Sequence, residues 1–324
     1  MQGTSINSVA GAGASVGYSL TLPEVSTDIA TLNSDAIKAL STSTIAALTP
    51  VKLGLIQPES IPGLPVAALP TGSIGALSTN QLAFLGSAQL TALGSVAIRE
   101  LKTSQIPTLS TLQISSLKPE QVGFGVLQTD QIQSLTSSQV AALTTAQVVS
   151  FTPLQIKALT TSQFQAMTTA QLSALTTLQI SSIETADLKA LAANNTQIQA
   201  LSSQQLGALG NDNVSTLFAL TSFGLTSKQI AAISTTSLNA LSTAQINHLS
   251  SEQVQGLTSG QVATLRTDHI NALTPDLLQA LTSANIQAIP TANLALITPS
   301  QISNFTSSQI DALTSAQISA LSSD

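Results

Sequence analysis

Large apolar residues recur at every eighth position through most of the chain. Between Leu135 and Leu191 the step is strict, and the successive octads read LTSSQVAA, LTTAQVVS, FTPLQIKA, LTTSQFQA, MTTAQLSA, LTTLQISS and IETADLKA. If the large apolar residue is position 0, then Thr or Ser falls at position 1, Gln at position 4, Ile, Val or Leu at position 5, and usually Ala at position 7. Such an internal repeat determines the architecture, so it is interpreted before any other feature.

Each octad carries the signals of a helix start. A Thr or Ser followed three residues later by Gln is a capping box, in which the hydroxyl accepts from the N3 amide and the Gln side chain reaches back to the N-cap amide. The apolar residues at positions 0 and 5 then form a hydrophobic staple. Leu143, Thr144, Gln147 and Val148 show all four parts. Proline is tolerated at the first helical residue, which this assignment places at position 2. Five prolines occupy it: Pro50, Pro119, Pro153, Pro275 and Pro299.

The octad predicts an array of short helices. A continuous helix would advance by about 800° per octad, so its apolar stripe would drift by about 80° and face no single partner. We therefore expect a helix of about six residues in each octad, with a corner at positions 0 and 1. Helices this short persist only by stacking, which predicts an all-α solenoid with positions 2, 3 and 6 outside.

A β-solenoid is the alternative fold. Thr, Ile and Val favour strands, and stacked Gln side chains can form ladders. The apolar positions 0, 5 and 7, however, do not follow a period of two, and Pro, Ala and Gln are frequent. The agreement between cap, staple and proline position favours the helical fold.

Departures from the octad divide the chain into sections. Residues 1–27 are rich in Gly, Ser and Val and lack the octad, so we interpret them as an N-terminal arm and a candidate docking segment. Residues 28–50 form a short octad section. Residues 51–70 are rich in proline, which rules out a long helix and predicts a bend or linker. Residues 71–324 form the main octapeptide-repeat solenoid.

The array is interrupted at three places. Two-residue insertions occur around Gly123–Gly125 and at Asn194–Asn195, and residues 217–224 keep the length of an octad but lose its motif. With about 30 octads in all, the chain is a repeat protein rather than a domain with a biased segment.

The composition limits the classes of partner. Only 7% of the residues are charged, against about 25% in typical globular domains. The net charge is -6 and the few Lys and Arg residues are scattered, so neither nucleic acid nor an anionic membrane surface is an expected partner. The chain has no cysteine, which excludes disulfides, thiolate metal sites and cysteine nucleophiles.

The sequence carries no Sec-type signal. The first residues, MQGTSINSVAGAGASVGYSL, have neither a basic region nor a continuous apolar region. No run approaches 18 apolar residues, because Ser, Thr or Gln interrupts every few positions, so no transmembrane segment is expected.

The repeated Gln at position 4 is the first candidate for chemistry. It is interpreted either as half of the capping box or as a ligand-binding or self-pairing ladder. A ligand-binding or self-pairing ladder would require the same residue at position 4 in every octad, whereas a helix cap tolerates other polar residues there. Four such replacements occur at position 4: Asp187, Asn213, Asn285 and Asn293.

Other candidate sites are isolated. His248 falls at position 7 and His269 at position 4, with no nearby pair of carboxylates at ligand spacing, although Asp268 precedes the second. The segment GAGASVG at residues 11–17 lacks the Lys-Ser/Thr ending of a phosphate loop. We therefore expect a protein that is not an enzyme, with no catalytic residues, metal or cofactor.

The motifs resemble two known kinds of repeat. FTPLQIKAL at residues 151–159 resembles the opening of a TAL-effector repeat, but those repeats are much longer and carry a base-reading loop that this chain lacks. From about residue 28 the chain is similar to the LTxxQIxAL octapeptide arrays of large, cysteine-free surface or secreted proteins of proteobacteria, often called adhesin-like. The resemblance implies a surface or secreted structural role, and export by a type I route would be consistent with it.

The sequence therefore predicts a non-enzymatic structural protein, extracellular or on the cell surface. We expect it to form a filament, sheath, layer or adhesin stalk, with other copies of itself as head-to-tail partners through an exposed solenoid end or the arm. A polysaccharide- or ice-binding module is the alternative, because the chain presents regular Thr and Ser. The capping role of Thr at position 1 disfavours a free hydroxyl array.

Overall fold

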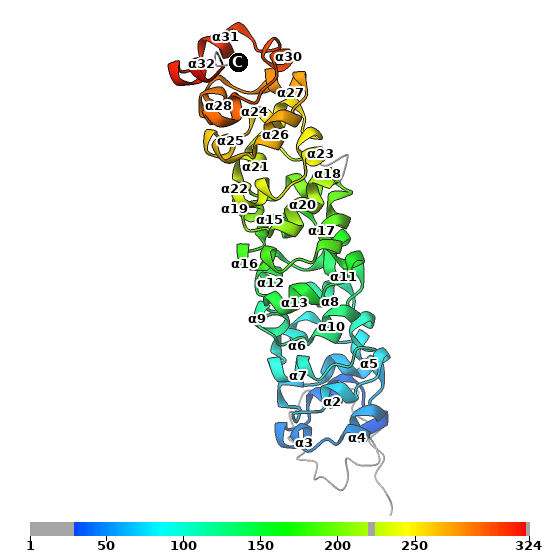
Figure 1. Ribbon diagram of the computed structural model, residues 1–324. Coiled ribbons are helices and arrows are strands. Elements are labelled where there is room, and N and C mark those ends of the chain that lie inside the picture. The colour runs from blue at the N-terminus through cyan, green and yellow to red at the C-terminus, as the bar shows by residue number, and fades with distance from the viewer. Residues whose placement is uncertain (1–28, 220–223, 322–324) are drawn as a thin grey trace, which may run out of the picture. The chain divides into compact units, whose positions relative to one another are not determined.

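The computed structural model describes residues 29–219 and 224–321 (Figure 1). Contacts divide the chain into two compact units, Met1–Leu93 and Gly94–Asp324. The described residues form short helices and no strand, so the predicted α-solenoid is confirmed in preference to the β-solenoid. The N-terminal arm predicted for residues 1–27 lies outside the described residues.

The first unit is built of helical elements three to six residues long. Among them, η2 packs against both α2 and α5, and η3 packs against α3 and α6. The elements are η1 (Ile29–Thr31), α2 (Ser34–Lys38), α3 (Thr42–Ala46), α4 (Pro50–Leu55), η2 (Pro58–Gly63), η3 (Val66–Ala68), η4 (Ile74–Ala76), α5 (Thr79–Ala83) and α6 (Ser87–Ala92).

The proline-rich segment 51–70 is folded into short helical turns. Ile61, Leu64 and Val66 are buried there, and Gly63 lies so close to α2 that an added Cβ would be 1.9 Å from the carbonyl oxygen of Ser34. Because 3₁₀ helices are short, they accommodate proline spacings that exclude a longer α-helix. The role predicted for this segment as a bend between two sections stays a prediction.

The second unit continues the short helices with one per octad. Its elements are α7 (Ser95–Arg99), η5 (Ile106–Thr108), α8 (Thr111–Ser116), α9 (Pro119–Val122), α10 (Thr129–Ser134), α11 (Ser137–Ala142), α12 (Thr145–Val149), α13 (Pro153–Ala158), α14 (Thr161–Ala166), α15 (Thr169–Ala174), α16 (Thr177–Ser181), α17 (Thr185–Ala192), α18 (Asn195–Gln199), α19 (Ser203–Gly207), α20 (Asn211–Ala219), α21 (Ser227–Ala232), α22 (Thr235–Asn239), α23 (Thr243–Asn247), α24 (Ser251–Gln255), α25 (Ser259–Thr264), α26 (Thr267–Ala272), α27 (Pro275–Ala280), α28 (Ser283–Ala288), α29 (Thr291–Leu294), α30 (Pro299–Ile302), α31 (Ser307–Asp311) and α32 (Ser315–Leu321).

Most helices of the second unit stack on those three places further along the chain, although α19 packs against α21 and α20 against α22. The series α8, α11, α14, α17 and α20 forms one such stack, in which each helix contacts the next (Figure 1). Inter-turn hydrogen bonds in the uninterrupted array join residues 25 to 31 apart, such as Ser137 with Ser162 and Gln163 with Ile132. One turn of the solenoid therefore takes between three and four octads.

Burial follows the octad. In the octad that begins at Leu159, the buried residues include Leu159 at position 0, Gln163 at position 4 and Phe164 at position 5, while positions 1, 2, 3 and 6 are exposed. The predicted outer positions 2, 3 and 6 are thereby confirmed for this octad. All five prolines predicted at N1 begin helices: α4, α9, α13, α27 and α30.

The interruptions are accommodated locally. At the first insertion the backbone turns through positive φ at Phe124 and Gly125, and a Cβ on Gly123 would be 1.9 Å from Ser150 Oγ. Before the second insertion α17 continues through Leu191 and has 8 residues, and α20, which runs into the stretch 217–224, has 9. Extra residues are thus taken up by a turn at the first insertion and by a longer helix at the second.

Candidate functional site: the hydrogen-bond ladder between turns

Most glutamines at position 4 link two helix ends through the side-chain amide, as Gln147 does. In Gln147, Oε1 accepts the N-cap N–H of Thr144 at 2.7 Å, which closes the capping box. Its Nε2 donates to the carbonyl oxygens of Ile114 at 2.8 Å and Leu117 at 2.7 Å, one turn earlier. The side chain is fully buried. One amide therefore satisfies the unpaired N–H of Thr144 at one helix start and the unpaired carbonyl of Leu117 after another helix, and it adds a second donor to the Ile114 carbonyl, which also accepts from the Leu117 N–H.

The same inter-turn bonds recur along the array, and we call them the ladder. In the second unit the glutamine Nε2 donates to a position-0 carbonyl one turn earlier, and in the first unit Gln81 and Gln89 donate to the carbonyls of Ile56 and Leu64. Members of the second unit include Gln131, Gln139, Gln147, Gln155, Gln163, Gln171, Gln179, Gln197, Gln205, Gln229, Gln253, Gln261, Gln309 and Gln317.

The capping role predicted for Gln is confirmed, but the ladder was missed. The donors of the glutamine side chain could have indicated these inter-turn bonds. A capping box uses only the amide oxygen of Gln, whereas the amide nitrogen carries two more donors. Buried donors need partners, and helix ends leave carbonyl acceptors unpaired. Buried amide donors and unpaired helix-end carbonyls together predict hydrogen bonds between turns. They do not show which carbonyl each glutamine meets.

The ladder survives the two insertions. Within uninterrupted sequence the glutamine lies 28 residues after its position-0 partner, as Gln163 does from Leu135. Across the first insertion the separation becomes 30, as for Gln147 and Leu117. Across the second it is also 30, as for Gln205 and Leu175. Each pair of inserted residues therefore lengthens the chain between a glutamine and its position-0 partner, and the hydrogen bond between them is kept.

Hydroxyl groups on the outer face also bond between turns. Ser95 Oγ at position 2 donates to the carbonyl oxygen of Glu120 at 2.9 Å, and Ser227 Oγ donates to that of Glu252 at 3.0 Å. Ser203, Ser259 and Ser283 make the equivalent bonds. These hydroxyls are therefore turned toward the protein's own backbone.

Asparagine at position 4 keeps a shorter version of the ladder. Asn285 retains the capping box with Thr282 and donates through Nδ2 to the Leu257 carbonyl at 2.9 Å. Asn213 and Asn293 donate to position-0 carbonyls at 3.0 Å. Asp187 is buried at the same position, and burial raises the pKa of its carboxyl group.

The octad that begins at Leu265 replaces both halves of the capping box, with Arg266 at position 1 and His269 at position 4. His269 is fully buried, and its Nε2 lies 2.9 Å from the Leu241 carbonyl oxygen, 28 residues earlier. Because a carbonyl only accepts, Nε2 carries the proton. His269 thus takes the place of a glutamine in the ladder.

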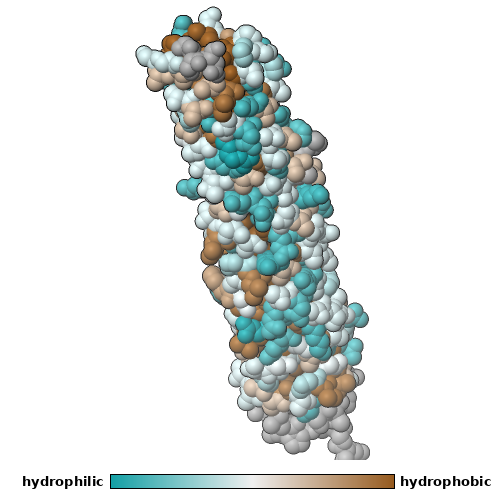
Figure 2. Space-filling model, viewed as in Figure 1, coloured by the Kyte–Doolittle hydropathy of each residue, from teal (hydrophilic) through white to brown (hydrophobic). Residues whose placement is uncertain are grey.

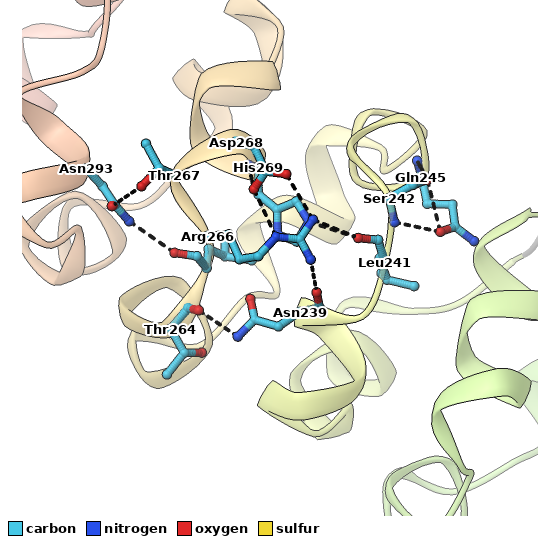
Figure 3. Close-up of polar contacts among 11 residues, drawn as sticks. Asn239, Leu241, Ser242, Gln245, Thr264, Arg266, Thr267, Asp268, His269 and Asn293 are labelled. Atoms are coloured by element: carbon cyan, nitrogen blue, oxygen red, sulfur yellow. Dashed lines mark hydrogen bonds and ion pairs between the residues drawn. The ribbon is translucent and has the colours of Figure 1, made fainter.

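Arg266 supplies further bonds between the same turns. Figure 3 shows its guanidinium between the Asp268 carboxylate and the carbonyls of Asn239 and Leu241. The hydrogen bond from Arg266 lowers the pKa of Asp268 below its ordinary range. Burial lowers the pKa of His269, and His269 Nδ1 is buried without a hydrogen-bond partner. A neutral imidazole fits this site, because a proton on Nδ1 would have no acceptor.

The two histidines lie in different surroundings. His248 is exposed at the end of α23, whereas His269 is buried in α26. Among the described residues, no cluster of three or more His, Cys, Asp or Glu side chains could hold a metal ion. The histidines and Asp268 are therefore placed as parts of the array, and the expectation that the protein is not an enzyme stays a prediction.

Few charged residues are available to the outer surface, because only 7% of the chain is charged. On the face drawn in Figure 2 most residues are pale or teal, with separate brown apolar groups and a larger brown area at the C-terminal end. Two ion pairs involve described residues, Lys157 with Glu184 at 3.4 Å and Arg266 with Asp268 at 2.9 Å, and both are exposed. No described helix has the length and apolar character that crossing a membrane requires.

Comparison with known families agrees with the repeat. A family model described as the ALTTAQ repeat matches residues 66–95, 180–218, 224–259 and 286–323. These stretches cover less than half of the chain, and their register and helical stacking define an octapeptide-type repeat protein with an α-solenoid fold. No curated protein matches the chain.

Proposed function

We propose that this chain is a non-enzymatic structural protein of the bacterial surface. It would assemble into an extracellular filament, sheath or layer, or form the stalk of an adhesin. The observation that supports this most is the ladder: the most repeated polar side chain of the octad is buried and bonded to the protein's own backbone, as Gln147 is. An array of this kind supplies a frame rather than a recognition surface.

The last described turn supports association with further octads. Ile310 and Ile318 occupy position 5, which is buried in earlier octads such as that of Phe164, yet they are 42% and 53% exposed. Covering them requires another turn of the same kind, from further residues or from a second copy. The first described octads carry Ala36, Thr44 and Lys52 at position 4, so a head-to-tail contact between copies would depend on apolar burial rather than on glutamine bonds.

Sedimentation and negative-stain microscopy of the full chain at rising concentration test this assembly. We expect elongated head-to-tail oligomers, and we expect I318K to reduce them because it places a charge on the apolar face. Its matched control is A316K, which adds the same charge at an exposed position of the same helix and should assemble as the natural chain does. Monomers alone at high concentration, or equal assembly by both variants, would contradict the proposal.

The alternative of a polysaccharide- or ice-binding module requires hydroxyl groups that are free to bind. The capping hydroxyl of Thr144 accepts from the backbone N–H of Gln147, and the hydroxyl of Ser227 at position 2 donates to a carbonyl, which disfavours such an array. Glycan-array and ice-affinity assays discriminate the two, because a structural subunit should score in neither.

We propose an extracellular or cell-surface location on the same grounds. Protease treatment of intact cells tests the location. Digestion of the protein while a cytoplasmic marker stays intact is expected, and equal protection of both would contradict it.

A further inference from the structure

Asp187 is the one carboxyl group at a ladder position in the described octads. It lies in α17, is 4% exposed, and accepts a hydrogen bond of 2.8 Å from Thr161 Oγ1 to its Oδ1. Thr161 belongs to α14, which packs against α17 from one turn earlier. The carboxyl group is therefore held between two turns rather than in solvent.

Two asparagines show what this position does elsewhere. Thr267 Oγ1 donates to Asn293 Oδ1 at 2.6 Å, and Asn293 Nδ2 donates to the Leu265 carbonyl at 3.0 Å. Thr185 and Asn213 repeat the arrangement, and Asn213 Nδ2 donates to a position-0 carbonyl. In both, the oxygen accepts from a threonine and the nitrogen donates to the backbone.

Asp187 has the same threonine bond but no amide nitrogen. By the register of the octads, its second oxygen, Oδ2, corresponds to Asn293 Nδ2, and the carbonyl 28 residues earlier is that of Leu159. With this register, an ionised carboxylate would place one acceptor opposite another. When it is protonated, the hydroxyl can donate to the carbonyl and restore the rung.

We propose that Asp187 is a proton-dependent lock between two turns of the second unit. In its protonated form the side chain donates to the Leu159 carbonyl and holds α17 to the preceding turn. Loss of the proton removes that donor and leaves a buried negative charge beside an acceptor, so the contact loosens. The array would thus be held more firmly at this joint in an acidic medium than in a neutral one.

The surroundings of Asp187 favour retention of the proton. Burial is the main cause of its raised pKa, and the charge of Glu184, the N-cap residue of α17, acts in the same direction, while the Thr161 hydrogen bond acts in the opposite direction. Lys157 on α13 is paired with Glu184. Lys189 lies on α17 and Asp212 on α20, which packs against α17, whereas α14 and α18 carry no ionisable residue.

The direction of the pH effect follows from the raised pKa. The folded carboxyl binds its proton more tightly than the unfolded one, whose ordinary value is 3.8. The stability that it contributes is therefore fully present below pH 3.8 and is lost as the pH rises through the folded pKa.

The test compares the natural chain with D187N, which supplies the amide found at the equivalent positions. Hydrogen exchange of peptides covering α14 and α17 is measured from pH 4 to pH 8 and corrected for the intrinsic exchange rate. We expect D187N to slow local opening about tenfold at pH 8 and less than about twofold at pH 4, because the natural chain regains its donor on protonation. D187Q should behave similarly, since it restores the common octad.

D276N is the matched control, because Asp276 is an exposed carboxylate in a comparable octad. It should leave exchange in α14 and α17 unchanged at every pH. An effect of D187N that is equal at pH 4 and pH 8 would show that the proton plays no part. Faster opening in D187N at pH 8 would overturn the lock altogether.

Discussion

The glutamine at position 4 combines two tasks in one side chain. In Gln147 the amide oxygen holds the start of α12, and the amide nitrogen holds the end of a helix one turn earlier. Because the Thr144 N–H and the Leu117 carbonyl would otherwise lack a partner, the cost of losing this side chain exceeds the modest net gain of an ordinary hydrogen bond.

Replacement of Gln147 by Ala should therefore destabilise the fold by about 3 kcal/mol. It leaves the Thr144 N–H and the Leu117 carbonyl without a partner and removes one of the two bonds to the Ile114 carbonyl. Urea unfolding followed by circular dichroism measures the loss. Q204A is the control, because Gln204 is exposed at position 3, and it should change the free energy of unfolding by less than about 0.5 kcal/mol. Similar losses in both variants would mean that the ladder contributes little.

At the scale of the helix, the residues at the N-terminus determine where each helix begins. Thr144 and Gln147 form the capping box that their spacing predicts, and Pro153 begins α13 as the proline rule requires. Such local signals could be predicted because they depend on residues three or four positions apart. The 3₁₀ turns of 51–70 and the long helix α20 could not, since the packing around them selects their length.

Helix α26 begins without a capping box, because Arg266 and His269 replace Thr and Gln. H269Q should supply the missing amide oxygen to the Arg266 N–H, as Gln121 does for Lys118, while its nitrogen keeps the bond to Leu241. We expect the variant to be at least as stable as the natural chain at pH 7.

The same variant should remove a loss of stability in acid. The pKa of folded His269 is lowered from its ordinary 6.5, so the stability present above pH 6.5 is lost as the pH falls through the folded pKa. Thermal unfolding between pH 7 and pH 5 measures the difference between H269Q and the natural chain. H248Q, at an exposed histidine, is the control, and an identical pH profile for all three would contradict the assignment.

At the scale of the molecule, register holds the solenoid together. The sequence predicts the stacking of octads, but it did not predict a turn of between three and four octads. That number depends on where each Gln nitrogen meets a carbonyl 28 residues away, as Gln309 meets Leu281. A local repeat has no preference for one distant octad over the next, because all present the same carbonyl.

This equivalence makes whole octads interchangeable. Deletion of residues 281–288 should bring Gln309 opposite the Leu273 carbonyl and keep the ladder, with a change in melting temperature of no more than about 3 °C. Deletion of residues 281–284 alone should place Gln309 opposite Leu277, which is not a position-0 residue. Circular dichroism should then show lost helix and a broadened transition, and equal melting of the two deletions would refute a register set by octads.

Because the glutamine amides point inward, the positions that hold the fold together are different from the positions that form the outer surface. Positions 0, 1, 4 and 5 determine the fold, because they supply the helix caps, the ladder bonds and the apolar core. Positions 3 and 6 mostly face solvent and can change one at a time without disturbing a rung. Two solenoids of this kind could therefore share every internal contact and have no surface chemistry in common. Their functions would then depend on the residues at positions 3 and 6, which the fold does not constrain.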